Sequence, residues 1–101
     1  MKIETVTIVR IYIREQENLL NKLIKFLHDD SEVAGVTVLR GIEGFSGSGE
    51  THTAFLVDLS LDLPLVVEFY DEPKRVEQVI DALLRRFSLS HIVSWSASRY
   101  R

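Results

Sequence analysis

The sequence predicts an α+β domain with elements in the order β-α-β-(β)-β-α-β, in which an antiparallel sheet carries two helices on one face. Two stretches place apolar residues at the 3.6-residue period of an amphipathic helix, and five are extended in character, with apolar, β-branched or alternating side chains. A segment rich in glycine and serine separates two of the extended stretches. The length of 101 residues corresponds to one domain, residues 1–101.

The first strand is predicted over residues 6–13. Apolar and aromatic residues occupy both of its alternating sets, which is typical of a strand covered on both sides. One set is Val9, Ile11 and Ile13; the other is Ile8 and Tyr12, interrupted by Arg10. The first helix is predicted over residues 15–29. Its apolar stripe is Leu19, Leu20, Leu23, Ile24 and Leu27.

The middle of the chain is predicted to form a hairpin and a further strand. Residues 36–42 are extended, and the segment after them holds three of the five glycines of the chain. Residues 51–61 alternate apolar and polar side chains, as a half-buried strand that pairs back does. Residues 65–70 form the next strand, with Glu68 as its one charge.

The last third of the chain is predicted to form a helix and a strand. Asp71 suits the N-cap position, and Pro73 suits the first helical turn. The apolar stripe of this helix is Val76, Val79, Ile80, Leu83, Leu84 and Phe87. The final strand is predicted over residues 91–96, and we expect its Trp95 to lie in the core together with Phe69.

This order of elements is the ferredoxin-like split β-α-β pattern with one additional hairpin strand. Two helices can cover one face of such a sheet. The other face would then carry Ile8, Tyr12, Val66 and Tyr70, and exposed apolar patches of that kind mark interfaces. We therefore expect a homo-oligomer in which the open sheet faces of the subunits meet.

Composition excludes several classes of function. The net charge of −3 provides no basic surface for nucleic acid or for anionic membranes. The absence of cysteine excludes disulfides, cysteine-based zinc sites and thiol catalysis. No apolar run approaches the roughly 18 residues of a membrane span, and the first residues lack the pattern of a signal peptide. We therefore expect a cytoplasmic protein without membrane insertion.

The strongest ligand candidate is Arg40-Gly41 together with Gly44, at the start of the glycine- and serine-rich segment. Arginine supplies a fixed fork of donors that suits phosphate or carboxylate. Glycines beside it let backbone N–H groups converge on an anion. The alternative is a strand that ends in a hairpin, with Arg40 paired to a carboxylate. Near the C-terminus, Arg99 and Arg101 form either a solvated tail or a contact with the anion site of a neighbouring subunit.

Other polar residues offer weaker signals. Arg10 and Glu68 are charges in otherwise apolar strands, and the topology makes those strands neighbours, so we expect a structural ion pair within or between subunits. None of the three histidines has metal-site spacing, and only His52 borders the loop. The sequence contains no G-x-S-x-G, P-loop or H-E-x-x-H motif, so we expect no enzymatic activity.

Several phrases of the sequence together resemble one known family. They are VAGVTVLRGIEGF at residues 33–45, the small residues that follow, HTAFLVDLSLDLPLVVEFYDEPKRVEQVIDAL at residues 52–83, and RIYI in the first strand. The combination resembles the PII-like domain-of-unknown-function family 190 nearly end to end. The resemblance implies the ferredoxin-like fold of the PII signalling and CutA proteins, which are typically trimers whose open sheet faces meet in the middle.

The resemblance also implies a regulatory function. PII proteins bind adenine nucleotides in clefts between subunits, and they move the loop after the second strand, here residues 44–52, to engage partner proteins. An adenine nucleotide or another small anion would be held by Arg40, Gly41, Gly44, Phe45 and His52, and ordering of residues 45–50 would select the partner. The alternative is a CutA-like divalent-metal or stress-response protein without catalytic activity, in which His52, Asp58 and Asp62 would converge on the metal.

Overall fold

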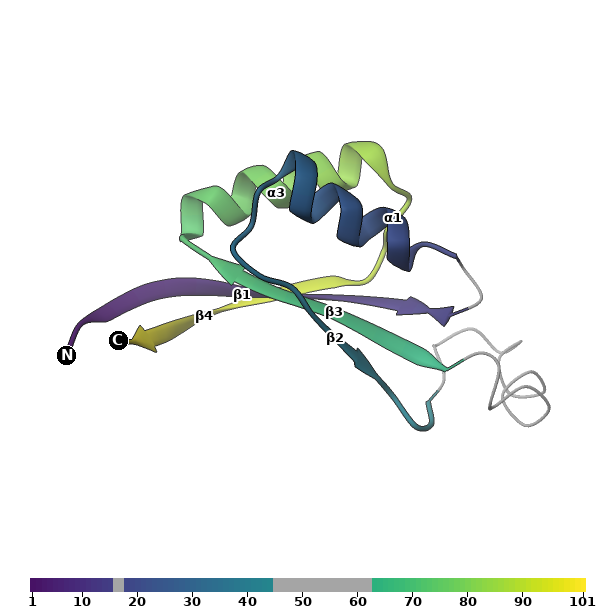
Figure 1. Cartoon of the computed structure of the whole chain (residues 1–101), viewed down its shortest axis with the longest axis horizontal. Helices are drawn as coiled ribbons and strands as arrows, with labels where there is room; N and C mark the ends of the chain where they lie inside the picture. The colour runs from purple at the N-terminus through teal and green to yellow at the C-terminus, as the bar shows by residue number, and fades with distance from the viewer. Residues whose placement is uncertain (16–17, 45–62) are drawn as a thin grey trace.

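The computed structural model describes residues 1–15, 18–44 and 63–101, which form a four-stranded sheet with helices on one face (Figure 1). The strands are β1 (Ile3–Arg14), β2 (Thr37–Arg40), β3 (Pro64–Asp71) and β4 (Ile92–Tyr100). The helices are α1 (Leu20–Lys25), which continues into the π-helical turn η2 (Phe26–Asp30), and α3 (Pro73–Arg86). Neighbouring strands are antiparallel, in the order β2-β3-β1-β4. The predicted α+β, ferredoxin-like architecture is confirmed.

The core lies between the helices and the face of the sheet that they cover. Val9 and Ile11 of β1 are fully buried and lie opposite Phe69 and Val67 of β3. The helices contribute further fully or nearly fully buried side chains, namely Leu23, Leu27, Val76 and Leu83. Because burial of one such side chain stabilises the fold by about 1.5–3 kcal/mol, this alternation fixes which face of β1 and β3 meets the helices.

The first helix is shorter than the predicted span of residues 15–29. Asn18 has a φ of 55°, in the left-handed region, which cannot belong to a continuous right-handed helix. The helix therefore begins at Leu20. It ends in η2, where the backbone N–H of Ser31 donates to the carbonyl of Phe26 at 3.0 Å, a bond over five residues.

The start of α3 also differs from the prediction in one residue. Pro73 occupies the first turn as expected, but the N-cap residue is Glu72 and not Asp71. Asp71 is still the last residue of β3, and its Oδ1 accepts a hydrogen bond from the backbone N–H of Glu72 at 2.7 Å. The Asp71 carboxylate thus stabilises the turn that leads into the helix.

The second face of the sheet is not covered by α1, η2 or α3 (Figure 1). Tyr12, Tyr70 and Trp95 remain 43%, 45% and 43% exposed on it. The prediction that Trp95 belongs to the core is wrong, because the β1–β4 register places it opposite Ile8 on the uncovered side. Phe69, in contrast, is 2% exposed, as predicted.

The C-terminal residues continue the sheet. β4 extends to Tyr100, and Arg101 exchanges two backbone hydrogen bonds with Lys2, of 2.5 and 2.9 Å, so the solvated-tail alternative is wrong. The predicted strand over residues 51–61 lies outside the described residues. Within the described ranges, no helix is long and apolar enough to cross a membrane.

Candidate functional site

Three of the residues predicted to bind a ligand lie where β2 ends. Arg40 occupies the last position of the β2–β3 ladder, opposite Leu65, and the backbone N–H of Gly41 donates to the carbonyl of Pro64 at 2.7 Å. A Cβ on Gly41 would lie 2.7 Å from Pro64 Cγ, and a Cβ on Gly44 would lie 3.2 Å from it. The absence of a side chain at Gly41 is therefore what allows this close approach. Phe45 and His52 lie outside the described residues.

The side chain of Arg40 is 62% exposed, and its guanidinium pairs with the carboxylate of Glu15. This contact matches the alternative in which the arginine of the hairpin has a carboxylate partner. An exposed pair of this kind stabilises a fold by only about 0–1 kcal/mol. Loss of the Arg40–Glu15 pair would therefore cost the fold little.

Arg10 and Glu68 form an ion pair across neighbouring strands. Arg10 Nε donates to Glu68 Oε1 at 2.7 Å, and the two residues are direct partners in the β1–β3 register. The guanidinium also lies over the Trp95 ring, 5.7 Å from its centroid. The hydrogen bond to Glu68 is the main reason that the pKa of Arg10 is raised further, with Tyr12 adding to the effect. The uncovered sheet face thus carries an ion pair in its middle, with apolar and aromatic side chains around it.

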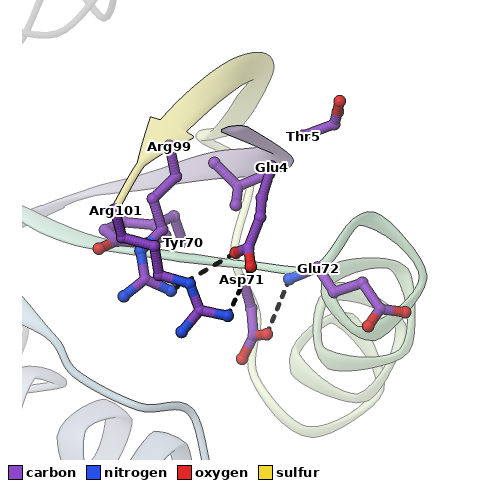
Figure 2. A pocket seen from close by; sticks show the side chains of 8 residues that line it. Glu4, Thr5, Tyr70, Asp71, Glu72, Arg99 and Arg101 are labelled. Atoms are coloured by element: carbon purple, nitrogen blue, oxygen red, sulfur yellow. Dashed lines mark hydrogen bonds and ion pairs between the residues drawn. The ribbon is translucent and has the colours of Figure 1, made fainter. Parts of the chain in front are cut away.

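A pocket of about 420 Å³ lies at the opposite end of the sheet, between the two chain termini and the start of α3 (Figure 2). Its walls come from the first residues of β1, the last residues of β3 and the end of β4. The lining residues are Glu4, Thr5, Val6, Tyr70, Asp71, Glu72, Arg99 and Arg101. The pocket therefore brings two arginines to a place built from both ends of the chain.

Glu4 is the centre of the charge network in this pocket, and Figure 2 shows its carboxylate turned toward the arginines. Arg101 Nη2 donates to Glu4 Oε1 at 2.6 Å, Arg99 Nη1 lies 3.7 Å from Oε2, and Lys2 Nζ lies 3.5 Å from Oε1. The hydrogen bond from Arg101 is the main cause of a lowered pKa for Glu4. Sequence reasoning missed Glu4 and Lys2, because only the β1–β4 register brings Glu4 opposite Arg99.

The two arginine sites lie at opposite ends of the subunit. Arg40 is opposite Leu65, near the start of β3, whereas Asp71 at the end of β3 lines the pocket that contains Arg101. At about 3.3 Å per residue, the length of β3 places these ends roughly 20–25 Å apart. A ligand of ordinary metabolite size cannot contact both sites of one subunit.

The described residues contain no group of three or more histidines or carboxylates placed to hold a metal ion. His28 Nδ1 contacts Asp29 Oδ1 at 2.7 Å, and His91 Nδ1 contacts the Ser90 hydroxyl at 3.1 Å. His52, Asp58 and Asp62, which the CutA-like alternative requires, lie outside the described residues.

Solved structures place this fold in the PII-like class. One similar structure is that of CPII, a nitrogen regulatory PII-like protein from Thiomonas intermedia K12, bound to ADP, AMP and acetate. The match covers 100% of this chain and 94% of CPII, with a TM-score of 0.68 and 16% sequence identity. A putative PII-like signaling protein from Thermus thermophilus matches over 98% of this chain and 91% of its own, with a TM-score of 0.62 and 12% identity. Identities this low establish the fold alone.

The family follows from the sequence comparisons. The model of the DUF190 family, described as "Uncharacterized ACR", matches residues 6–98, so the chain belongs to that family. A UPF0166 protein from Aquifex aeolicus (strain VF5) is 32% identical over 69 residues, which are 68% of this chain and 70% of the relative. The resemblance to family 190 that the sequence phrases indicated is confirmed.

Proposed function

We propose that this protein is a trimeric, cytoplasmic, PII-like regulatory protein without catalytic activity. It binds a small anionic metabolite, such as an adenine nucleotide, in clefts between subunits. Arg40, Gly41 and Gly44, together with Phe45 and His52, hold the ligand on one side of the cleft. Ordering of residues 45–50 around the ligand then changes which partner protein the trimer engages, a common route of switching.

The observation that carries the proposal is the placement of arginines at both ends of the sheet. Arg40 lies at one end, and Arg99 and Arg101 lie at the other, in a pocket large enough for part of a small ligand. Because one ligand cannot reach both ends of one subunit, an anion held by all three must lie between two subunits. Guanidinium groups favour phosphate and carboxylate over neutral ligands.

The uncovered sheet face supports assembly into an oligomer. In most strands of such a sheet the apolar set faces the helices, but in β4 it faces the other way. Its apolar set, Val93, Trp95 and Ala97, is in register with the uncovered side of β1. The serines at positions 94, 96 and 98 belong to the set on the helix side. Burial of the apolar set against other copies of the chain removes its aromatic surface from water.

The ligands of the structural relatives support an anionic metabolite. The Thiomonas protein is bound to ADP, AMP and acetate in one structure and to ADP and bicarbonate in another. All of these ligands carry phosphate or carboxylate-like groups, which suit arginine forks. An adenine nucleotide is therefore the first ligand class to test for this chain.

Native mass spectrometry of protein purified gently from its own cells tests the proposal. It counts the subunits and weighs retained ligand in one measurement. We expect a trimer that carries a few hundred daltons per subunit, on the scale of a nucleotide, and we expect Arg40→Gln to lose that mass. A bare trimer that takes up neither ADP nor ATP would contradict the ligand part of the proposal, and a monomer would contradict the assembly.

A further inference from the structure

The arginines of the pocket at the chain termini are paired with a carboxylate of the protein itself. The Glu4 carboxylate accepts the 2.6 Å hydrogen bond of Arg101 and has Lys2 Nζ and Arg99 Nη1 within 4 Å. Three cationic side chains from both ends of the chain thus converge on one carboxylate. Figure 2 shows two of them, Arg99 and Arg101, beside Glu4. Two further carboxylates, Asp71 and Glu72, also line the pocket, but Asp71 is paired with Arg75 and with the Glu72 N–H. The three cations around Glu4 can therefore exchange its carboxylate for a more highly charged anion.

We infer that Glu4 is an internal competitor that occupies the position of the ligand's anionic group on Arg99 and Arg101. This inference rests on the proposed function, because it concerns regulation of the same site. Binding of a phosphate or carboxylate group to these arginines then requires the Glu4 side chain to rotate away from them.

The geometry allows this rotation without disturbing the fold. The backbone of Glu4 is held in the β1–β4 ladder opposite Arg99, so only its side chain has to move. That side chain is 25% exposed, and the Arg99 and Arg101 side chains are 41% and 52% exposed. Displaced toward solvent, the carboxylate recovers hydration while the ligand takes over the hydrogen bonds of the arginines.

The competition discriminates between anions. A singly charged carboxylate such as acetate gains no more from Arg101 than Glu4 does, and it also loses translational freedom. A group with two or more negative charges, such as pyrophosphate or the diphosphate of ADP, interacts more strongly with all three cations. The site therefore selects multiply charged phosphates over simple carboxylates, because a ligand must bind the arginines more strongly than Glu4 does.

Calorimetric titration of the whole protein with pyrophosphate, ADP and acetate tests this role of Glu4. We expect Glu4→Gln, which retains an acceptor for Arg101 but removes the charge, to bind pyrophosphate and ADP about tenfold more tightly than the wild type. We also expect it to gain measurable binding of acetate.

Asp71→Asn is the matched control. It removes one carboxylate charge from the same pocket, but Asp71 contacts Arg75 and the Glu72 N–H. We expect it to strengthen binding by less than about threefold, since only a screened longer-range charge is lost. An equal gain in both variants would show general electrostatics and overturn the inference.

The remaining outcomes separate the inference from the proposed function. Wild-type binding of ADP with no gain in Glu4→Gln would overturn the role of Glu4 and leave the nucleotide proposal standing. Binding by Glu4→Gln alone would support the competitor and contradict nucleotide binding by the wild type. Failure of both proteins to bind would overturn both. In the wild type, the Arg101 guanidinium NMR signals should also shift on addition of pyrophosphate; unchanged signals during binding would likewise overturn the inference.

Discussion

Arg10 and Glu68 face each other across β1 and β3, and Arg10 Nε donates to Glu68 Oε1 at 2.7 Å in the middle of the uncovered sheet face. The two side chains are 35% and 29% exposed in the single chain. When copies of this face meet, both charges leave water, and each then depends on the other for compensation. The pair is therefore the polar centre around which the proposed trimer interface is arranged.

Removal of one partner of this pair should weaken the assembly more than removal of both. In Glu68→Leu, Arg10 is left without its carboxylate on an apolar surface, whereas Arg10→Met with Glu68→Leu leaves no unpaired charge. Sedimentation over a dilution series measures the effect. The single variant should dissociate at higher concentration than the double variant; equal dissociation of the two would show that the pair does not lie in the interface.

A charge placed on the uncovered face should separate the subunits. Trp95→Glu introduces a carboxylate among the exposed aromatic residues of that face, where it would be buried by a neighbouring subunit. Leu84→Glu is the control, because Leu84 is 53% exposed on α3, on the helix side of the sheet. Light scattering should give a monomer for Trp95→Glu and the wild-type mass for Leu84→Glu. A trimer in both variants would place the interface elsewhere.

A methyl group at Gly41 should destabilise the corner at the end of β2. In Gly41→Ala the new Cβ would lie 2.7 Å from Pro64 Cγ, and the rigid ring cannot move without disturbing the start of β3. We expect a loss of roughly 1–3 kcal/mol in the free energy of unfolding, measured in urea. Gly35→Ala meets nothing within 4 Å and should change this free energy by less than about 1 kcal/mol. Equal effects at both positions would contradict the close approach.

The charge network of Glu4 should give a pH dependence of stability. The hydrogen bond from Arg101 lowers the pKa of Glu4 in the folded chain. The ionised Glu4 therefore stabilises the fold at pH values above the ordinary glutamate pKa, about 4.3. This stabilisation is lost as the pH falls through the lower pKa of the folded chain. Carboxyl NMR titration should place the pKa of Glu4 below the ordinary glutamate value. Arg101→Gln should return the Glu4 pKa toward its ordinary value; a pKa that stays low in this variant would assign the shift to another group.

Much of the fold could be predicted because the periodicity of the sequence carries it. Val9, Ile11 and Ile13 alternate as a buried set, and the helical stripes contain Leu23 and Leu83, which are fully buried. The Arg10–Glu68 contact also followed from topology, since charges on neighbouring strands require partners. These features depend on local pattern and on the order of elements.

The features that could not be predicted depend on register or on single backbone angles. The start of the first helix follows from the left-handed φ of Asn18, which no periodicity indicates. The exposed side of Trp95 follows from its pairing with Ile8, whereas an aromatic residue in a strand suggests core. The pocket around Glu4 joins residues 97 positions apart in the sequence, Glu4 and Arg101. Three of the candidate ligand residues, Arg40, Gly41 and Gly44, lie together at the end of β2. Their proximity could be predicted because they are close in sequence.

The most direct test of the shared cleft is complementation between subunits. Arg40→Gln and Arg101→Gln trimers should each lose ADP binding, since each lacks one side of every cleft. If the ligand lies between subunits, trimers formed from both variants in equal amounts should recover binding in about a quarter of their clefts, where Arg40 of one subunit meets Arg101 of the next. Calorimetric titration of the mixed trimers with ADP measures that fraction. No recovery in properly mixed trimers would contradict a cleft shared between subunits.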